Sequence, residues 1–273
     1  MSMMNLASLA EIADRHGCDK GLTGPSRRWS ANNYVDVYEA LFRPLRFEPL
    51  HIQEIGIGVT GDAWDAKVVH GANLGGGASL KTWAEYFPNS KVYGLDINDG
   101  SHLNSDRIRT FIVDQSSRSE LQSFLAQVGS LTFDIIIDDG SHRADHQQIT
   151  LETLWPRLKD GRHYFIEDLN NRGFGGDSGG RHEAANTVPT RRLFSSYRSS
   201  GAVPRPNAFA NDAFLSQIDD IVFYCPQPIL RPRDLFIELF RLLLRRGSKG
   251  ISRTEYSPAS YQVVALRKCD ADS

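Results

Sequence analysis

The fold is decided by residues 133–142, which have the sequence FDIIIDDGSH. The segment from Phe133 to Ile137 is a largely apolar, β-branched run, as in a strand that is buried on both faces of a parallel sheet. Two carboxylates, a glycine and a histidine follow, and open α/β sheets bind their ligands at this end of a strand. We therefore predict a parallel sheet with a functional site where this strand ends.

A second strand with acids at its end is predicted downstream. Residues 164–168 have the sequence YFIED, an apolar run that leads into Glu167 and Asp168. Adjacent residues of a regular strand point to opposite faces, so these two carboxylates can share one ion only if the strand has ended by Glu167 or Asp168. Two strands that end in acids, with a histidine between them, predict a metal and a base at one site.

The rest of the chain alternates between strand and helix patterns. This alternation predicts an α/β fold with a seven-stranded, mostly parallel sheet and helices on both faces. The expected strands are residues 51–59, 91–97, 109–115, 133–138, 163–168, 221–225 and 261–267. The expected helices are residues 5–16, a segment after Ser30 that stops before Pro44, and residues 79–87, 117–128 and 145–157.

An N-terminal segment and one main domain are predicted. Residues 1–48 form an N-terminal helical segment and residues 49–273 the main domain, in which the glycine-rich region around 170–211 is interpreted as a loop, either a lid over the substrate or plain disorder. Residues 234–246 predict a short apolar helix, for which a core or dimer contact and attachment to a membrane surface are the alternatives.

Composition excludes several classes of protein. A net charge of -2 argues against binding to a nucleic acid backbone, which usually requires a basic excess. The longest apolar runs fall short of the roughly 18 to 20 residues that span a bilayer, and the first residues lack the pattern of a signal peptide. Cys18, Cys225 and Cys269 form neither a paired disulfide set nor a zinc spacing. We expect a cytoplasmic enzyme with reduced cysteines and no membrane span.

The first predicted strand ends in a glycine-containing turn. Residues 53–58, QEIGIG, offer free amides and a close approach to a ligand, but the third glycine of the dinucleotide fingerprint is missing. Asp96 ends the second strand, where a carboxylate can accept hydrogen bonds from both hydroxyls of a ribose. Asp114 and Gln115 end the third strand within reach of an adenine, and Ser79 follows three glycines as a helix cap or a ligand contact. A cap or a solvated turn is the alternative for each acid.

Taken together, these motifs resemble the class I S-adenosylmethionine-dependent methyltransferases, which have a Rossmann-like fold. More narrowly, the chain is similar to the metal-dependent sugar O-methyltransferases of antibiotic biosynthesis. The resemblance spans residues 50–170 and is carried by residues 54–58, 76–83, 86–88, 94–96, 114–116, 138–142 and 167–169, with 13–15 and 19–21 nearer the N-terminus.

The resemblance implies S-adenosylmethionine and Mg²⁺ as cofactors and a small-molecule sugar acceptor. A homo-oligomer is also predicted. It implies that His142 is the general base and that the metal ligands are Asp139, Glu167 and Asp168. The implied donor-site residues are Glu54, Gly56, Ser79, Asp96, Asp114 and Gln115. Three carboxylates suit a hard ion such as Mg²⁺, and a histidine pKa near 6.5 suits proton removal at neutral pH.

Some residues and functions stay open. Asp138 is left without a role at the metal, and His146 and His163 are interpreted as structural or exposed. A metal-dependent O-methyltransferase that acts on a catechol-like acceptor and a non-catalytic nucleotide-binding module are the alternative functions.

Overall fold

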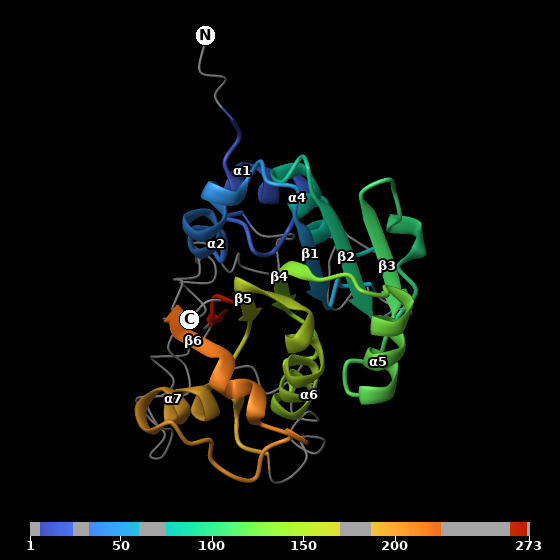
Figure 1. Ribbon diagram of the computed structural model, residues 1–273. Helices are drawn as coiled ribbons and strands as arrows, with labels where there is room; N and C mark the ends of the chain where they lie inside the picture. Colours follow the sequence, from blue (N-terminus) through green and yellow to red (C-terminus); the bar gives the residue numbers. More distant parts are fainter. Residues whose placement is uncertain (1–5, 24–32, 60–74, 170–186, 225–262, 272–273) are drawn as a thin grey trace, which may run out of the picture.

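The computed structural model describes residues 6–23, 33–59, 75–169, 187–224 and 263–271. Its centre is a seven-stranded sheet with the strand order β3-β2-β1-β4-β5-β7-β6 (Figure 1). The strands are β1 (His51–Ile55), β2 (Lys91–Asp96), β3 (Ile108–Ile112), β4 (Phe133–Asp138), β5 (Leu158–Ile166), β6 (Ile218–Tyr224) and β7 (Val263–Lys268). The predicted α/β fold with seven strands is therefore confirmed.

The first five strands are parallel, and β7 is the one described strand that runs opposite to the other six. β1 pairs with β2 on one side and with β4 on the other. The chain adds β2 and β3 on one side of β1 and then β4 and β5 on the other, so the strand order reverses between β1 and β4. β7 lies between β5 and β6 and is antiparallel to both. In open α/β sheets, ligands bind at the carboxyl ends of the strands beside such a switch point, which here lies between β1 and β4.

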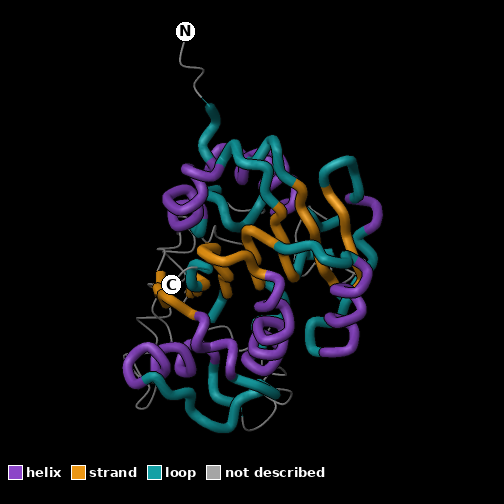
Figure 2. The backbone as a smooth tube through the Cα atoms, in the orientation of Figure 1, coloured by secondary structure: helices purple, strands orange, loops and turns teal. Residues whose placement is uncertain are grey.

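Helices cover both faces of the sheet (Figure 2). They are α1 (Leu9–His16), α2 (Val35–Phe42), α4 (Ala78–Tyr86), α5 (Arg118–Gln127), α6 (Ala144–Leu154) and α7 (Thr190–Ser200). α1, α2 and α4 pack on one face and α5, α6 and α7 on the other, each group with its own apolar core. Because β4 is buried on both faces, Ile135 and Ile137 enter the first core and Ile136 enters the second.

The N-terminal helices belong to the first of these cores. Leu9 of α1 and Tyr38 of α2 are fully buried, and they lie in the same cluster as Ile52 of β1 and Phe165 of β5. α1 starts later than the sequence pattern suggested, because Ser8 caps it in a box with Glu11. The division of the chain after residue 48 stays a prediction.

The loop predicted for residues 170–211 is wrong over part of its length. Residues 190–200 form α7, whose Leu193 and Phe194 are buried in the second core. The sequence TRRLFSSYRSS gives a weak helix signal, because most of its residues are serines and arginines. Its apolar stripe consists of Leu193, Phe194 and Tyr197. Residues 170–186 and the predicted helix 234–246 lie outside the described residues. Within the described part of the chain, no helix has the length and apolarity to cross a bilayer.

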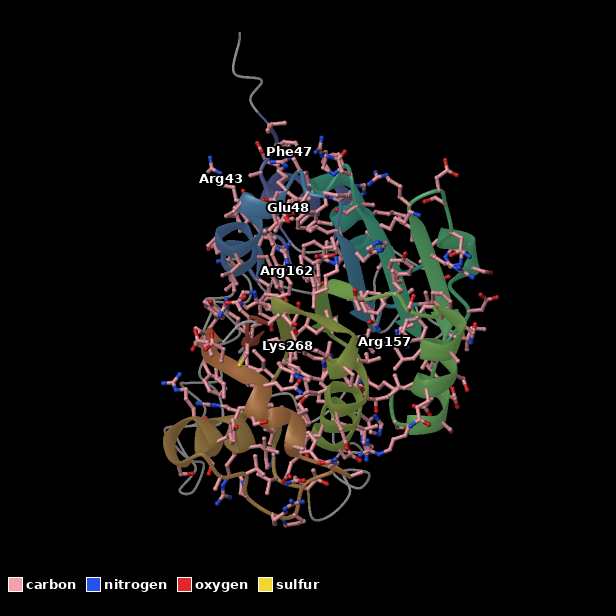
Figure 3. The ribbon with its side chains drawn as sticks, in the orientation of Figure 1. Arg43, Phe47, Glu48, Arg157, Arg162 and Lys268 are labelled. Atoms are coloured by element: carbon pink, nitrogen blue, oxygen red, sulfur yellow. The ribbon has the colours of Figure 1, made fainter. Side chains whose placement is uncertain are left out.

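The amino ends of the parallel strands carry ion pairs of a structural kind. Asp134 at the start of β4 is almost fully buried and pairs with Lys159 at 2.8 Å and with Arg162 at 3.5 Å. Arg162 also pairs with Glu48, just before β1, at 2.9 Å (Figure 3). These charges compensate one another, so the amino edge has a structural role and the opposite, carboxyl edge of the sheet is the candidate for function.

Candidate active site

The buried amide side chain of Gln115 hydrogen-bonds to the turn after β4. Asp138, the last residue of β4, accepts hydrogen bonds from Gln115 at 3.2 Å and from the backbone of Gly140 at 3.4 Å. The Gln115 carbonyl oxygen in turn accepts the backbone N–H of Ser141 at 2.6 Å. Burial raises the pKa of Asp138 to about 6. Asp138 and Gln115 thus fix the shape of the turn.

Gly56 lets the end of β1 pack directly against this turn. Its φ is +79°, and a Cβ at this position would lie 2.2 Å from the backbone oxygen of Asp139. Both the left-handed conformation and the contact between two backbones favour glycine. The predicted donor-site glycine therefore has a packing role in the structure, and its donor-binding role stays a prediction.

We expect Gly56→Ala to lower the free energy of unfolding by about 3 kcal/mol, because backbone strain and overpacking add at this position. Gly201→Ala is the matched control, since Gly201 has a φ of +69° but nothing within 4 Å of its added Cβ. The control is expected to cost about 1 kcal/mol from strain alone. Urea denaturation of the two variants measures both values, and equal losses would contradict the packing role.

His142 lies between two carboxylates at the carboxyl edge of the sheet. Its Nε2 is 3.6 Å from Oδ2 of Asp168, and its Nδ1 is 3.9 Å from Oδ1 of Asp139. Ligand atoms of Asp139, His142 and Asp168 all lie within 4.8 Å of one another, an arrangement that can hold a metal ion. The structure thus brings together three of the four residues predicted for the metal and the base.

Unusual backbone conformations aim two of these side chains. His142 has a φ of +59° and Asp168 a φ of +53°, values that few residues other than glycine adopt and that cluster at functional sites. β5 ends at Ile166, so Glu167 and Asp168 lie beyond the regular strand. The expected strand over residues 163–168 is therefore too long at its carboxyl end, and the condition for both carboxylates to share one ion is met.

Glu167 lies beside this group and is held by different partners. Its carboxylate is fully buried and accepts hydrogen bonds from the Tyr38 hydroxyl and, at 2.7 Å, from the Lys20 ammonium. Burial and the nearby Asp139 charge raise its pKa well above the ordinary value, against the pull of Lys20. Its role as a metal ligand stays a prediction.

Lys20 is a buried charge for which the sequence pattern predicts no role. Its ammonium contacts Asp139 and lies 3.6 Å from Oε1 of Glu54, whose other oxygen accepts the indole N–H of Trp83 at 3.2 Å. Burial disfavours the charge of Lys20, but Asp139, Glu167 and Glu54 outweigh this and hold its pKa well above the ordinary value. Burial raises the pKa of Glu54 to about 7 despite the opposing effect of Lys20.

The donor set fits a hard divalent cation. The three predicted ligands are carboxylates, the oxygen donors that Mg²⁺ prefers. Their charges meet at one place, and Lys20 offsets one of them. A divalent ion would balance the remaining excess of negative charge, since buried carboxylates require compensation.

The predicted donor-site residues lie around the ends of β1, β2 and β3. Asp96, at the end of β2, accepts backbone N–H groups from Ile57 at 3.1 Å and Val59 at 3.3 Å, so its carboxylate faces the turn after β1. Asp114 is partly exposed, and its Oδ1 accepts the backbone N–H of Ser116. The carboxylate of Asp96 beside the glycine-containing turn after β1 suits a ribose, in keeping with the sequence prediction.

Ser79 does not cap α4, so that alternative is wrong. The helix begins at Ala78 with Gly77 as its N-cap at a φ of +71°, and no side chain caps it. The three consecutive glycines allow this left-handed entry, which places Ser79 inside the first turn. Burial raises the pKa of Glu54, and Ser79 opposes this rise from its position in the first turn.

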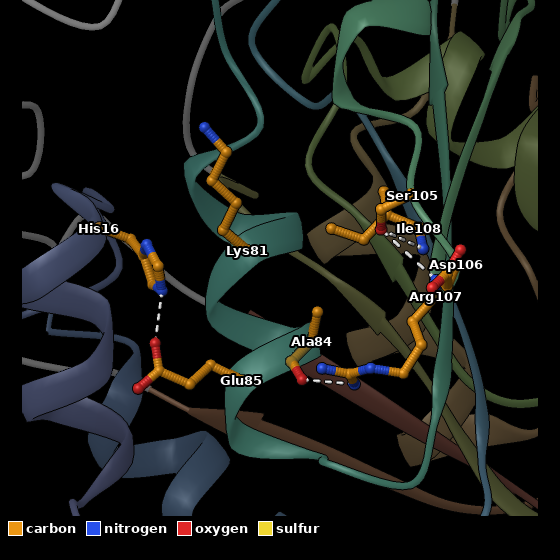
Figure 4. Close-up of a pocket in the computed structure, with 8 residues that line it drawn as sticks. All are labelled: His16, Lys81, Ala84, Glu85, Ser105, Asp106, Arg107 and Ile108. Atoms are coloured by element: carbon orange, nitrogen blue, oxygen red, sulfur yellow. Dashed lines mark hydrogen bonds and ion pairs between the residues drawn. The ribbon is translucent and has the colours of Figure 1, made fainter.

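A surface pocket of about 440 Å³ lies elsewhere, between α4 and the start of β3 (Figure 4). An ion pair of 2.7 Å between His16 and Glu85 borders it, and Arg107 binds the backbone oxygen of Ala84. None of the predicted site residues lines it. We therefore do not assign the chemistry to this pocket.

Known proteins with similar sequences are sugar O-methyltransferases of antibiotic pathways, which confirms the predicted resemblance. The 8-demethyl-8-alpha-L-rhamnosyl tetracenomycin-C 2'-O-methyltransferase of Streptomyces olivaceus is 36% identical over 165 residues, which are 60% of this chain and 38% of that protein. Demethylmacrocin O-methyltransferase of Streptomyces fradiae is 39% identical over 156 residues, 55% of this chain and 36% of that protein. Mycinamicin VI 2''-O-methyltransferase of Micromonospora griseorubida is 37% identical over 145 residues, 52% of this chain and 33% of that protein.

The matched regions are only part of these relatives. The chain spans 33% to 42% of the length of the curated proteins that it matches. No protein-family model matches the chain. Among solved structures, the MycE methyltransferase of the mycinamycin biosynthetic pathway, in complex with Mg and SAH, aligns with a TM-score of 0.62 at 23% identity. This alignment covers 98% of the chain and 56% of MycE, and it supports the class I methyltransferase fold.

Proposed function

We propose that the protein transfers a methyl group from S-adenosylmethionine to a hydroxyl of a deoxysugar, with Mg²⁺ as the metal and His142 as the general base. The acceptor sugar is carried by a nucleotide or by a glycosylated natural product. The observation that carries the proposal is the convergence of Asp139, His142 and Asp168 at the carboxyl edge of the sheet, next to the switch point between β1 and β4.

The donor site is supported by the position of Asp96 and by the turn after β1. Asp96 ends β2 with its carboxylate turned toward this turn, where a ribose can take the place of the backbone N–H groups. MycE, which shares the fold, is in complex with SAH, the demethylated form of the donor. We therefore propose that Glu54, Gly56, Ser79, Asp96, Asp114 and Gln115 surround the donor.

The proposed metal ligands are Asp139, Glu167 and Asp168. When bound, the ion would stabilise the developing alkoxide and orient neighbouring sugar hydroxyls. His142 accepts the hydroxyl proton as the oxygen attacks the methyl carbon. The O–C bond forms while the S–C bond breaks, and the sulfur leaves as a neutral thioether. Asp168, 3.6 Å from His142, stabilises the imidazolium that results.

A sugar acceptor is favoured over a catechol by the similarity to the sugar O-methyltransferases. The tetracenomycin-C 2'-O-methyltransferase named above acts on a rhamnosyl compound, and one MycE structure contains mycinamycin VI together with Mg and SAH. A non-catalytic module is disfavoured because the base and the carboxylates are all present. A cytoplasmic location and a homo-oligomer stay predictions, the second testable by light scattering.

A methyl-transfer assay tests the proposed function. Radiolabelled S-adenosylmethionine and Mg²⁺ are supplied with a nucleotide-linked rhamnose, with rhamnosyl glycosides or with catechol. We expect the label to appear in at least one sugar acceptor. Methylation of catechol alone would favour the alternative acceptor, and donor binding without transfer to any acceptor would favour the binding module.

A further inference from the structure

A lysine from the N-terminal segment lies among the predicted metal ligands. Lys20 follows α1 in the sequence, and its side chain is only 2% exposed. Its ammonium donates hydrogen bonds to Oδ2 of Asp139 and to Oε2 of Glu167. It therefore links the turn after β4 to the end of β5.

Two tyrosines of the same segment complete the arrangement. Tyr34 lies immediately before α2 and Tyr38 lies one helical turn later, so their side chains share one face of the helix. The Tyr34 hydroxyl donates to Oδ1 of Asp168, and the Tyr38 hydroxyl donates to Oε1 of Glu167. Both tyrosines are fully buried, so these hydrogen bonds are shielded from water.

We propose that three side chains of the N-terminal segment are positioning residues for the metal carboxylates. They are Lys20, Tyr34 and Tyr38. The proposal deepens the proposed function, on whose metal site it rests.

In Asp139 and Asp168, one hydrogen bond fixes one carboxylate oxygen and thereby aims the other, whereas both oxygens of Glu167 accept hydrogen bonds. In Asp168, Oδ1 is held by Tyr34 while Oδ2 faces the imidazole of His142. In Asp139, Oδ2 is held by Lys20 while Oδ1 faces the same imidazole. Hydrogen bonds to metal ligands orient them in this way, and their loss typically lowers metal affinity about 10- to 100-fold.

Lys20 has an additional electrostatic role. Carboxylates at such short range repel one another, and this repulsion opposes folding of the metal-free protein. One internal ammonium offsets part of the repulsion and still leaves an excess of negative charge for a divalent ion. The N-terminal segment is therefore expected to hold the site ready before the metal arrives.

Binding of Mn²⁺ to the full chain, without donor or acceptor, tests the proposal. Free Mn²⁺ is measured by electron paramagnetic resonance for the wild type, for Tyr34→Phe and for the control Tyr86→Phe. Tyr86 is equally buried, and its hydroxyl contacts Glu39 at 3.2 Å, outside the metal carboxylates. We expect the Kd to rise about 10- to 100-fold in Tyr34→Phe and to stay unchanged in the control.

A purely structural role of Tyr34 would give a different result. The thermal midpoint in EDTA would then fall further in Tyr34→Phe than in Tyr86→Phe. We expect equal falls instead, because the phenylalanine ring keeps the packing volume in both variants. In turnover assays, Tyr34→Phe should raise the KM for Mg²⁺, while kcat at saturating Mg²⁺ recovers. An unchanged Kd in Tyr34→Phe would overturn the inference and leave the proposed function intact. Failure of the wild type to bind Mn²⁺ would overturn both.

A second variant tests the role of Lys20. In Lys20→Met the carboxylates lose their internal counter-charge, so the metal-free protein should melt at a lower temperature. Added Mg²⁺ should then raise the melting temperature by more than in the wild type. An equal rise in both proteins would overturn the role of Lys20, and a variant that folds only with Mg²⁺ present would support it.

Discussion

Removal of divalent cations is expected to slow methyl transfer at least about 100-fold, because a bound ion stabilises the developing alkoxide by several kcal/mol. A sugar hydroxyl is a poor nucleophile at neutral pH, so His142 alone cannot generate the alkoxide. Initial rates in EDTA and after re-addition of Mg²⁺ measure the effect. Re-addition should restore the rate in full, since Lys20 offsets part of the repulsion between the carboxylates in the metal-free protein.

Binding of the donor serves as the control for this experiment. Asp96, proposed to hold the ribose, lies at the end of β2, whereas the metal carboxylates follow β4 and β5. Calorimetric titration with S-adenosylhomocysteine should therefore give a similar Kd with Mg²⁺ and with EDTA. Full activity in EDTA would contradict the metal-assisted mechanism. A loss of donor binding in EDTA would mean that chelation unfolds the site, and the rate could then not be attributed to the metal.

The central strands and their functional ends could be predicted from local sequence. The run from Ile135 to Ile137 is apolar on both faces because β4 lies in the middle of the sheet. Asp139 and His142 are only three residues apart, so their proximity follows from one turn. Asp168 joins them because β4 and β5 are parallel neighbours, which follows from the alternation of strands and helices.

The contribution of the N-terminal segment could not be predicted in this way. Lys20 contacts Asp139 across 119 residues of sequence, and Tyr34 contacts Asp168 across 134. A lysine is expected at the surface, and the tyrosines fit the apolar face of a helix equally well without their hydroxyls. Only the packing of α2 over the end of β5 shows that these polar groups converge on the site.

Gln115 lies at the ligand-binding edge of the sheet, but its side chain stabilises the structure there. Such a role is difficult to predict from the sequence. It ends the third predicted strand, where a polar side chain suggests an adenine contact. In the structure both ends of its amide are engaged, by Asp138 and Thr150 on one side and by Ser141 on the other. Position in the sheet identified the correct neighbourhood, but the hydrogen-bond partners depend on how α6 and the turn after β4 pack.

Replacement of His142 by asparagine is expected to lower kcat about 10²- to 10⁴-fold, the usual contribution of a general base. Asparagine is the suitable replacement, because it tolerates the left-handed φ of +59° at this position, where alanine would add strain. Its amide cannot accept the hydroxyl proton. Rates are measured at saturating Mg²⁺, with His16→Asn as a control, since His16 pairs with Glu85 outside the site.

The same variant separates two roles of the imidazole. Ligand atoms of His142, Asp139 and Asp168 lie within 4.8 Å of one another, so the geometry alone allows His142 to bind the ion as well as to accept a proton. A hard ion prefers the carboxylate oxygens, so we expect Mn²⁺ to bind His142→Asn with nearly the wild-type Kd. A much weaker Kd would identify His142 as a ligand. A kcat within a few-fold of the wild type would contradict its role as the base, and the hydroxyl proton would then have to leave to another group at the carboxyl edge of β4 and β5.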